Sequence, residues 1–365
     1  MKRIVPALLL CAALLTLPAF ADSVPEQEYE LYGAGEVDES VPDSAREIIG
    51  DAGVEDALDP EGLFERLWDG ALQLAGELWS DAAAGAVKLI AVAALCSMGT
   101  ALSEGQTRQY VTLAGCLGVA AVAFGEAGQQ INAAAEAIEE MNSFSHALLP
   151  CLTATAAAGG MVTSAAARYA ATSLFMDILI TLSQSVLLPS AYALLAVKTA
   201  SAALGNRALD GAGKLLKWLA FTLTTAVVTA FTLWLSLSGA ITGATDSAAS
   251  KAAKTAISAA LPVVGGIISN AAGTLMAGAS LLKGAVGALG AVVIIAICLA
   301  PFISLALRYL LYKAAAALAS SFADDRVAGL IGDVGSVFAL VLGVTGACAA
   351  MLFVSVLSTI KAVGG

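Results

Sequence analysis

The sequence predicts an all-α, polytopic membrane protein with about six transmembrane helices plus interfacial or re-entrant helices. Composition is the first reason: apolar residues make up 59% of the 365 residues, charged residues make up 13%, and the mean hydropathy is +0.84. Soluble domains are typically about 45–50% apolar and about 25% charged. The second reason is a series of apolar runs long enough to cross a bilayer. Together these observations exclude an ordinary soluble enzyme and indicate a chain surrounded largely by lipid.

Negative charge is concentrated near the N-terminus. Residues 22–66 contain fifteen carboxylates and two basic residues, whereas the residues after 66 contain fourteen acidic and fourteen basic residues. The body of the chain therefore has no net charge and no basic patch that could neutralise nucleic-acid phosphates. We expect the lipid bilayer among its partners, and no nucleic acid.

The first 21 residues have the layout of a secretory signal peptide. Lys2 and Arg3 precede an apolar stretch over 4–17, and a small-x-small motif ends at Ala21. Fourteen apolar residues are too few to span a bilayer, which needs about 20. The sequence predicts cleavage after Ala21, which places the mature N-terminus outside the cytoplasm.

Two segments precede the membrane domain. Residues 22–58 are acidic and show little apolar periodicity, so we expect an extracytoplasmic segment without fixed structure. From Asp59 and Pro60 onwards, apolar residues recur at helical spacing and predict an amphipathic helix over 59–85. This helix either lies on the membrane surface or packs against the rest of the protein.

Residues 86–363 are predicted to form a multi-span membrane domain. Spans are expected at about 86–103, 110–125, 171–197, 218–239, 284–307 and 334–357. Two further apolar segments, 146–170 and 255–282, contain Pro and paired Gly, so we expect interfacial or re-entrant helices there. The excess of Lys and Arg in 198–217 predicts that this loop is cytoplasmic.

Two features are candidate functional elements. Asp177 lies within a predicted span, where it either forms an ion or proton site or meets water at the outer end of the span. A helix, a break and a second helix form a candidate hairpin that either lines a conduit, docks a partner or merely links two spans. The hairpin residues are Lys251, Lys254, Pro262, Gly265, Gly266 and Lys283.

The sequence shows no signature of catalysis or of ligand chemistry. The six cysteines occur singly, and His146 is the only histidine, so no spacing typical of a metal site occurs. Glycine-rich stretches lie in apolar surroundings, which does not favour a phosphate-binding loop. We therefore expect no catalytic, cofactor-binding or metal-binding residues, and no enzyme activity.

Several short segments of the apolar body resemble a known family. These segments are 251–258, 262–266, 281–287, 312–313 and 324–326. Together with the signal peptide, the multi-span body and the length, they resemble the stage III sporulation protein AE family over about 60–363.

The resemblance implies a membrane subunit of a channel or secretion-like complex in endospore-forming bacteria. That complex would connect mother cell and forespore and support late forespore gene expression. The implied partners are other stage III sporulation A-operon proteins and stage II sporulation protein Q. The implied location is the mother-cell membrane around the forespore. A stand-alone multi-span transporter or permease is the alternative, with Asp177 and a possible internal repeat as its best support.

Overall fold

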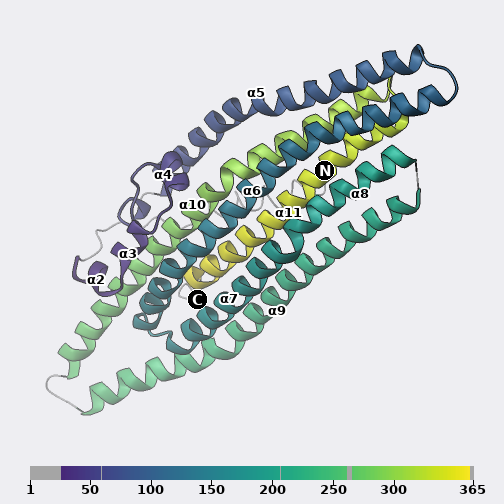
Figure 1. Cartoon of the computed structure of the whole chain (residues 1–365). Helices are drawn as coiled ribbons and strands as arrows, with labels where there is room; N and C mark the ends of the chain where they lie inside the picture. The colour runs from purple at the N-terminus through teal and green to yellow at the C-terminus, as the bar shows by residue number, and fades with distance from the viewer. Residues whose placement is uncertain (1–25, 59, 206, 261–264, 362–365) are drawn as a thin grey trace.

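The protein is an elongated bundle of long helices (Figure 1). The computed structural model describes residues 26–58, 60–205, 207–260 and 265–361, and the side chains of 29–57, 62–205, 209–237 and 280–360. Helices and turns account for these residues, and no strand occurs among them. The predicted signal peptide over 1–21, with its cleavage site at Ala21, lies outside the described residues.

Seven long helices make up the body of the bundle. They are α5 (Pro60–Ala101), α6 (Gln106–Ala158), α7 (Val162–Leu182), α8 (Leu188–Leu204), α9 (Arg207–Ala260), α10 (Gly265–Ala319) and α11 (Asp325–Lys361). A π-helical turn, η2 (Ser183–Leu187), joins α7 to α8 just before Pro189, whose missing N–H and ring disfavour a regular α-helical turn. Six helical stretches of the described chain, with α7 and α8 counted as one, are long and apolar enough to cross a membrane. The prediction of about six such helices is confirmed.

The helices run further than the predicted spans. The expected amphipathic helix over 59–85 and the first span form the single helix α5. Residues 146–158 continue α6 through Pro150, and the chain turns only at Gly160, which has φ of +91°. Residues 255–260 and 265–282 are the end of α9 and the start of α10. These segments are therefore ends of long helices rather than separate short helices.

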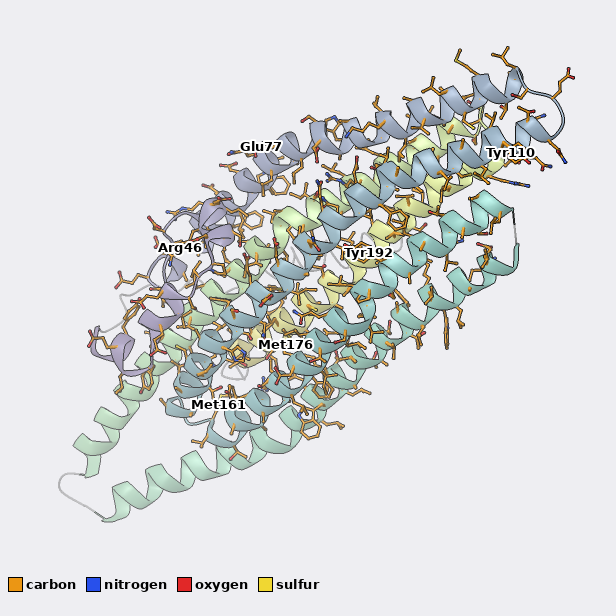
Figure 2. The ribbon with its side chains drawn as sticks, viewed as in Figure 1. Arg46, Glu77, Tyr110, Met161, Met176 and Tyr192 are labelled. Carbon is orange, nitrogen blue, oxygen red and sulfur yellow. The ribbon has the colours of Figure 1, made fainter. Side chains whose placement is uncertain are left out.

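Successive long helices run in opposite directions along the bundle, with α7 and α8 counted as one continuous stretch. The turns at 102–105 and 320–324 and the end of α8 at Gly205 lie at one end, where the Ser97 hydroxyl donates to the Phe322 carbonyl (2.5 Å) and Gly205 packs against the Arg326 guanidinium. Figure 2 labels Tyr110 near this end and Met161 at the opposite end. This up-and-down order places the loop within 198–217 at the same end as the α5–α6 turn.

Helix α10 is the core of the bundle. Every residue from Leu282 to Ile294 is buried, and α5, α6 and α11 surround the helix. A helix that is apolar on all sides is buried either by lipid or by protein. The most hydrophobic predicted span, 284–307, therefore owes much of its apolar character to burial against other helices rather than to lipid contact.

The acidic N-terminal segment is folded, which differs from the expectation for 22–58. Residues 26–58, here called the N-terminal module, form α2 (Glu26–Leu31), α3 (Ala34–Glu39), α4 (Asp43–Ile49) and the 3-10 turn η1 (Asp56–Leu58). The buried side chains of the module include Ala34, Val37, Val41, Ala45 and Ile49. The module packs on α6 and α10. Its few apolar residues gain a partner surface on the bundle, which average composition does not reveal.

Local polar contacts fix the N-terminal module. The Asp38 carboxylate accepts hydrogen bonds from the Tyr29 hydroxyl and from the Val54 amide (2.9 Å). The Arg46 guanidinium donates to the carbonyls of Val41 (3.0 Å) and Asp38 (2.7 Å). Burial, reinforced by Asp38, raises the pKa of Tyr29 above its ordinary value, so this phenol stays neutral and able to donate.

Candidate functional site: a charged layer across the bundle

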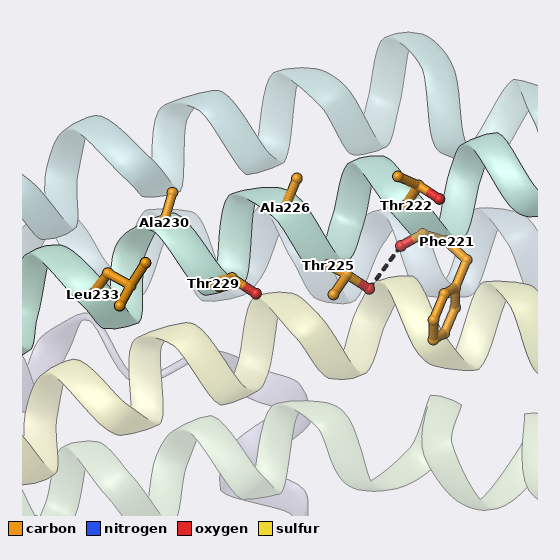
Figure 3. Close-up of a pocket in the computed structure, with 7 residues that line it drawn as sticks. All are labelled: Phe221, Thr222, Thr225, Ala226, Thr229, Ala230 and Leu233. Atoms are coloured by element: carbon orange, nitrogen blue, oxygen red, sulfur yellow. Dashed lines mark hydrogen bonds between the residues drawn. The ribbon is translucent and has the colours of Figure 1, made fainter.

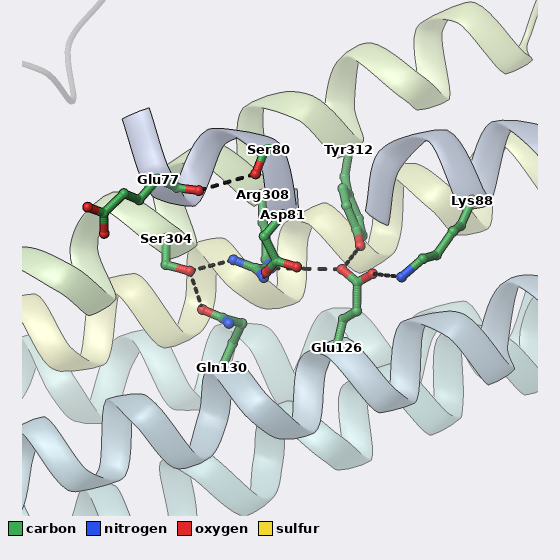
Figure 4. A network of polar contacts seen from close by, with 9 residues as sticks. All are labelled: Glu77, Ser80, Asp81, Lys88, Glu126, Gln130, Ser304, Arg308 and Tyr312. Carbon is green, nitrogen blue, oxygen red and sulfur yellow. Dashed lines mark hydrogen bonds and ion pairs between the residues drawn. The ribbon is translucent and has the colours of Figure 1, made fainter. Parts of the chain in front are cut away.

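An arginine buried in α10 is the centre of the candidate site. The side chain of Arg308 is 2% exposed, and its guanidinium pairs with the Asp81 carboxylate of α5. It also donates to the hydroxyl of Ser304, which in turn donates to the side-chain oxygen of Gln130 (2.8 Å). Figure 4 shows that these side chains converge from three helices. A buried cation needs such partners because an unpaired charge in the interior is costly.

Glu126 of α6 is a second anion that faces this arginine. Its Oε2 lies 3.8 Å from the Arg308 Nε and accepts a hydrogen bond from the Tyr312 hydroxyl. Its Oε1 lies 3.9 Å from the Nζ of Lys88 (Figure 4). The side chain of Glu126 is only 14% exposed, so it depends on these cationic and donor groups. The two carboxylates and two cations of the network balance in charge.

Helical spacing explains why these residues meet. Ser304, Arg308 and Tyr312 are four residues apart on α10 and share one face, as do Glu126 and Gln130 on α6. On α5, Gly85 lies between Asp81 and Lys88 on the facing surface, and a Cβ at this position would lie 2.7 Å from the Tyr312 hydroxyl. A glycine is therefore required where α5 approaches the carboxylate of Glu126.

A second group of ion pairs continues the layer toward α8, α9 and α11. The Nζ of Lys198 in α8 pairs with the Asp210 carboxylate of α9 and lies 3.3 Å from the Asp333 carboxylate of α11. Lys214 pairs with Asp210 at 3.1 Å. Lys313, next to Tyr312, donates to the Gly332 carbonyl (2.6 Å) and to Ser336 (3.0 Å) of α11.

We call these two groups together the charged layer. Its residues are Asp81, Lys88, Glu126, Gln130, Lys198, Asp210, Lys214, Ser304, Arg308, Tyr312, Lys313 and Asp333. They come from every long helix except α7. Such a layer fixes the helices in register, because shifting one helix would separate buried opposite charges.

Sequence reasoning missed the first group of this layer. The predicted spans 110–125 and 284–307 end just before Glu126 and Arg308, so both residues were expected in loops between spans. The structure brings them into one ion pair because α6 and α10 both continue past the predicted ends of their spans. The spacing of Ser304, Arg308 and Tyr312 was the available signal.

The predicted site residues lie elsewhere. Asp177 is exposed on α7. Lys283 is buried, and its Nζ donates to the carbonyls of Thr359 (3.0 Å) and Ile360 (3.3 Å). Arg168 of α7 donates to the Ser358 carbonyl, so two cations meet the C-terminal carbonyls of α11, as the helix dipole favours. The structure therefore assigns Lys283 a role at the end of α11.

The remaining hairpin residues have no described side-chain environment. Lys251 and Lys254 lie in α9, and Gly265 and Gly266 begin α10, but the side chains of 238–279 lie outside the described residues. Pro262 lies outside the described residues altogether. Among the side chains that the structure does describe, no group of three or more His, Cys, Asp or Glu could hold a metal ion.

Comparison with known proteins identifies the family. The family model described as Stage III sporulation protein AE matches residues 62–363, which is most of the chain and includes the whole charged layer. The chain belongs to the stage III sporulation protein AE family. It is 28% identical over 188 residues to Stage III sporulation protein AE of Bacillus subtilis (strain 168), a match that covers 52% of this chain and 47% of that relative. The match thus spans about half the length of the relative, and no solved structure matches the chain significantly.

The family match covers the membrane-spanning bundle and the charged layer. The matched region contains all six apolar helical stretches and excludes the whole N-terminal module, which ends at residue 58. A sporulation protein of this family is thus built here on a multi-span helical bundle. The ion pairs lie within the family region, whereas the acidic module precedes it.

Proposed function

We propose that the chain is a membrane subunit of the channel or secretion-like complex that connects mother cell and forespore. The family match over residues 62–363 carries this proposal. Six apolar helical stretches support it, because such a subunit must be embedded in a membrane. In this role it supports late forespore gene expression from the mother-cell membrane around the forespore. No observation favours an enzyme.

The proposed partners are other stage III sporulation A-operon proteins and stage II sporulation protein Q. The folded N-terminal module supports a role in an assembly, since it presents carboxylates on its outer surface beside α6. The alternative function, a stand-alone transporter, had Asp177 as one of its two supports. This carboxylate is exposed on α7 rather than enclosed by the bundle, so the structure does not favour that alternative.

Co-purification tests the proposed partners. An affinity-tagged chain, extracted in mild detergent from sporulating cells, should co-purify other stage III sporulation A-operon proteins and stage II sporulation protein Q. A tagged multi-span protein from the same membranes is the control and should recover none of them. Recovery of the tagged chain without any of these proteins would contradict the proposed assembly.

A further inference from the structure

One side of helix α9 has the properties of a lipid-facing surface. No charged residue occurs from Trp218 to Leu237, a stretch of 20 residues or about 30 Å, which matches the hydrocarbon thickness of a bilayer. The large exposed side chains of this stretch are Trp218, Leu219, Phe221, Leu233, Trp234 and Leu237. Tryptophans near both ends, with Lys214 and Lys217 before the first, are typical of a membrane span.

Four hydroxyl groups on α9, those of Thr224, Thr225, Thr232 and Ser236, donate to carbonyls of the same helix. Thr225 donates to the Phe221 carbonyl (2.7 Å) and Thr232 donates to the Val228 carbonyl (2.8 Å). Figure 3 shows Thr225 and Phe221 on a shallow surface formed by α9 alone. Hydroxyls bonded to their own backbone need no water, so this face can contact lipid.

Helix contacts show which part of α6 lies at the same height as this face. At one end, Gly213 of α9 packs against Leu194 of α8, and Tyr192 of α8 reaches Gly128 of α6. The end of the α9 face near Gly213 is therefore level with about residue 128 of α6.

A second chain of contacts fixes the other end of the α9 face. The rings of Phe231 in α9 and Phe175 in α7 are 5.7 Å apart. Thr172 of α7 bonds Ser355 of α11 (2.5 Å). Further along α11, Ile360 meets Gly287, which also faces Leu152 of α6. Phe231 is accordingly level with about residue 144 of α6, so the heights of 213–231 on α9 and 128–144 on α6 coincide.

At this height the outer surface of α6 is polar. Five exposed residues spaced three or four apart form what we call the polar stripe: Gln129, Asn132, Glu136, Glu139 and Ser143. Next to it, the Ser44 hydroxyl of the N-terminal module donates to Glu140 (2.5 Å). Figure 1 shows α9 along one edge of the bundle and the module beside α6 and α10 on the other. Lipid would solvate neither the two stripe carboxylates nor the module.

We propose that the polar stripe faces a water-filled space at membrane depth, while the α9 face contacts lipid. The bundle is then amphipathic across its width, with lipid on one side and water on the other. A lining with two carboxylates suits water, small polar solutes and cations. This proposal rests on membrane insertion and not on the identity of the complex, so it can fail while the co-purification succeeds, and the reverse.

Cysteine accessibility tests the two faces. Single cysteines are introduced as Asn132→Cys, Glu136→Cys and Glu139→Cys on α6, and as Thr222→Cys, Ala226→Cys and Leu233→Cys on α9. The five native cysteines that the structure describes are all buried, so the chain without an introduced cysteine gives the background rate of labelling. Native membranes, as spheroplasts and as inside-out vesicles, are treated with a charged, membrane-impermeant maleimide.

The stripe cysteines should react at least ten times faster than the α9 cysteines, from one side of the membrane or from both. Slow reaction at all three stripe positions from both sides, or equal rates on the two faces, would overturn the proposal. Labelling after denaturation confirms that each thiol is present. Each variant is also solubilised in mild detergent, where a folded chain should give reactive stripe cysteines. A variant that stays unreactive there is replaced by Gln129→Cys or Ser143→Cys.

Discussion

Arg308→Ala should destabilise the protein by about 3–5 kcal/mol, because it leaves the nearly buried Glu126 without its closest cation. Ser304 and the exposed Asp81 lose a partner in the same change. The effect should appear as a large fall in the thermal unfolding temperature of the detergent-purified protein. The matched control is Arg108→Ala, which removes an exposed arginine at the start of α6 and should leave the unfolding temperature almost unchanged.

Replacing both Arg308 and Glu126 should lower the free energy of unfolding by less than the sum of the two single changes. In Arg308→Met combined with Glu126→Gln, neither side chain is left as an unpaired buried charge. We expect a coupling free energy of about 1–3 kcal/mol from the double-mutant cycle. If the changes in unfolding free energy of the two single variants simply add up in the double variant, the two residues do not interact. That result would contradict the described network.

Gly85→Val should destabilise the protein by about 1–3 kcal/mol through overpacking. A Cβ at residue 85 would collide with the carboxylate of Glu126 and with the Tyr312 hydroxyl, which are tied to each other. Gly76→Val is the matched control on the same helix, since a Cβ there has no neighbour within 4 Å. This control should be neutral or slightly stabilising, because valine favours a helix more than glycine does.

Both variants are compared by thermal unfolding in the same detergent. Equal unfolding temperatures for Gly85→Val and Gly76→Val would show that α5 does not approach Glu126 closely. A fall confined to Gly85→Val would locate the close approach of α5 and α6 at this residue.

The helical, multi-span class could be predicted because a helix that faces lipid or the interior of the bundle needs long runs of apolar residues. The stretches 110–125 and 218–239 indeed lie inside α6 and α9. Their full length could not be predicted, since the polar residues after 125 suggested a loop. Gln129, Asn132, Glu136 and Glu139 lie on one exposed face of α6, while Ile131, Ile138 and Met141 are buried on the other.

The candidate site was harder to predict from the sequence than the fold class. Glu126 and Arg308 are far apart in the chain, and each stands beside the end of a predicted apolar span. Charges in such positions are ordinarily solvated, so only the four-residue spacing of Ser304, Arg308 and Tyr312 distinguished Arg308 from a loop residue. Lys283 was singled out for its place in the hairpin, yet its buried bonds to the end of α11 depend on tertiary contacts that no local pattern contains.

Late forespore gene expression in cells that lack the chain tests the proposed sporulation role most directly. The gene is deleted in the native spore-forming host, and a fluorescent reporter of late forespore transcription is followed during sporulation. We predict that the signal is lost in the deletion strain and restored by the wild-type chain, with an immunoblot of the membrane fraction confirming its presence. An undiminished signal in the deletion strain would contradict the proposed function.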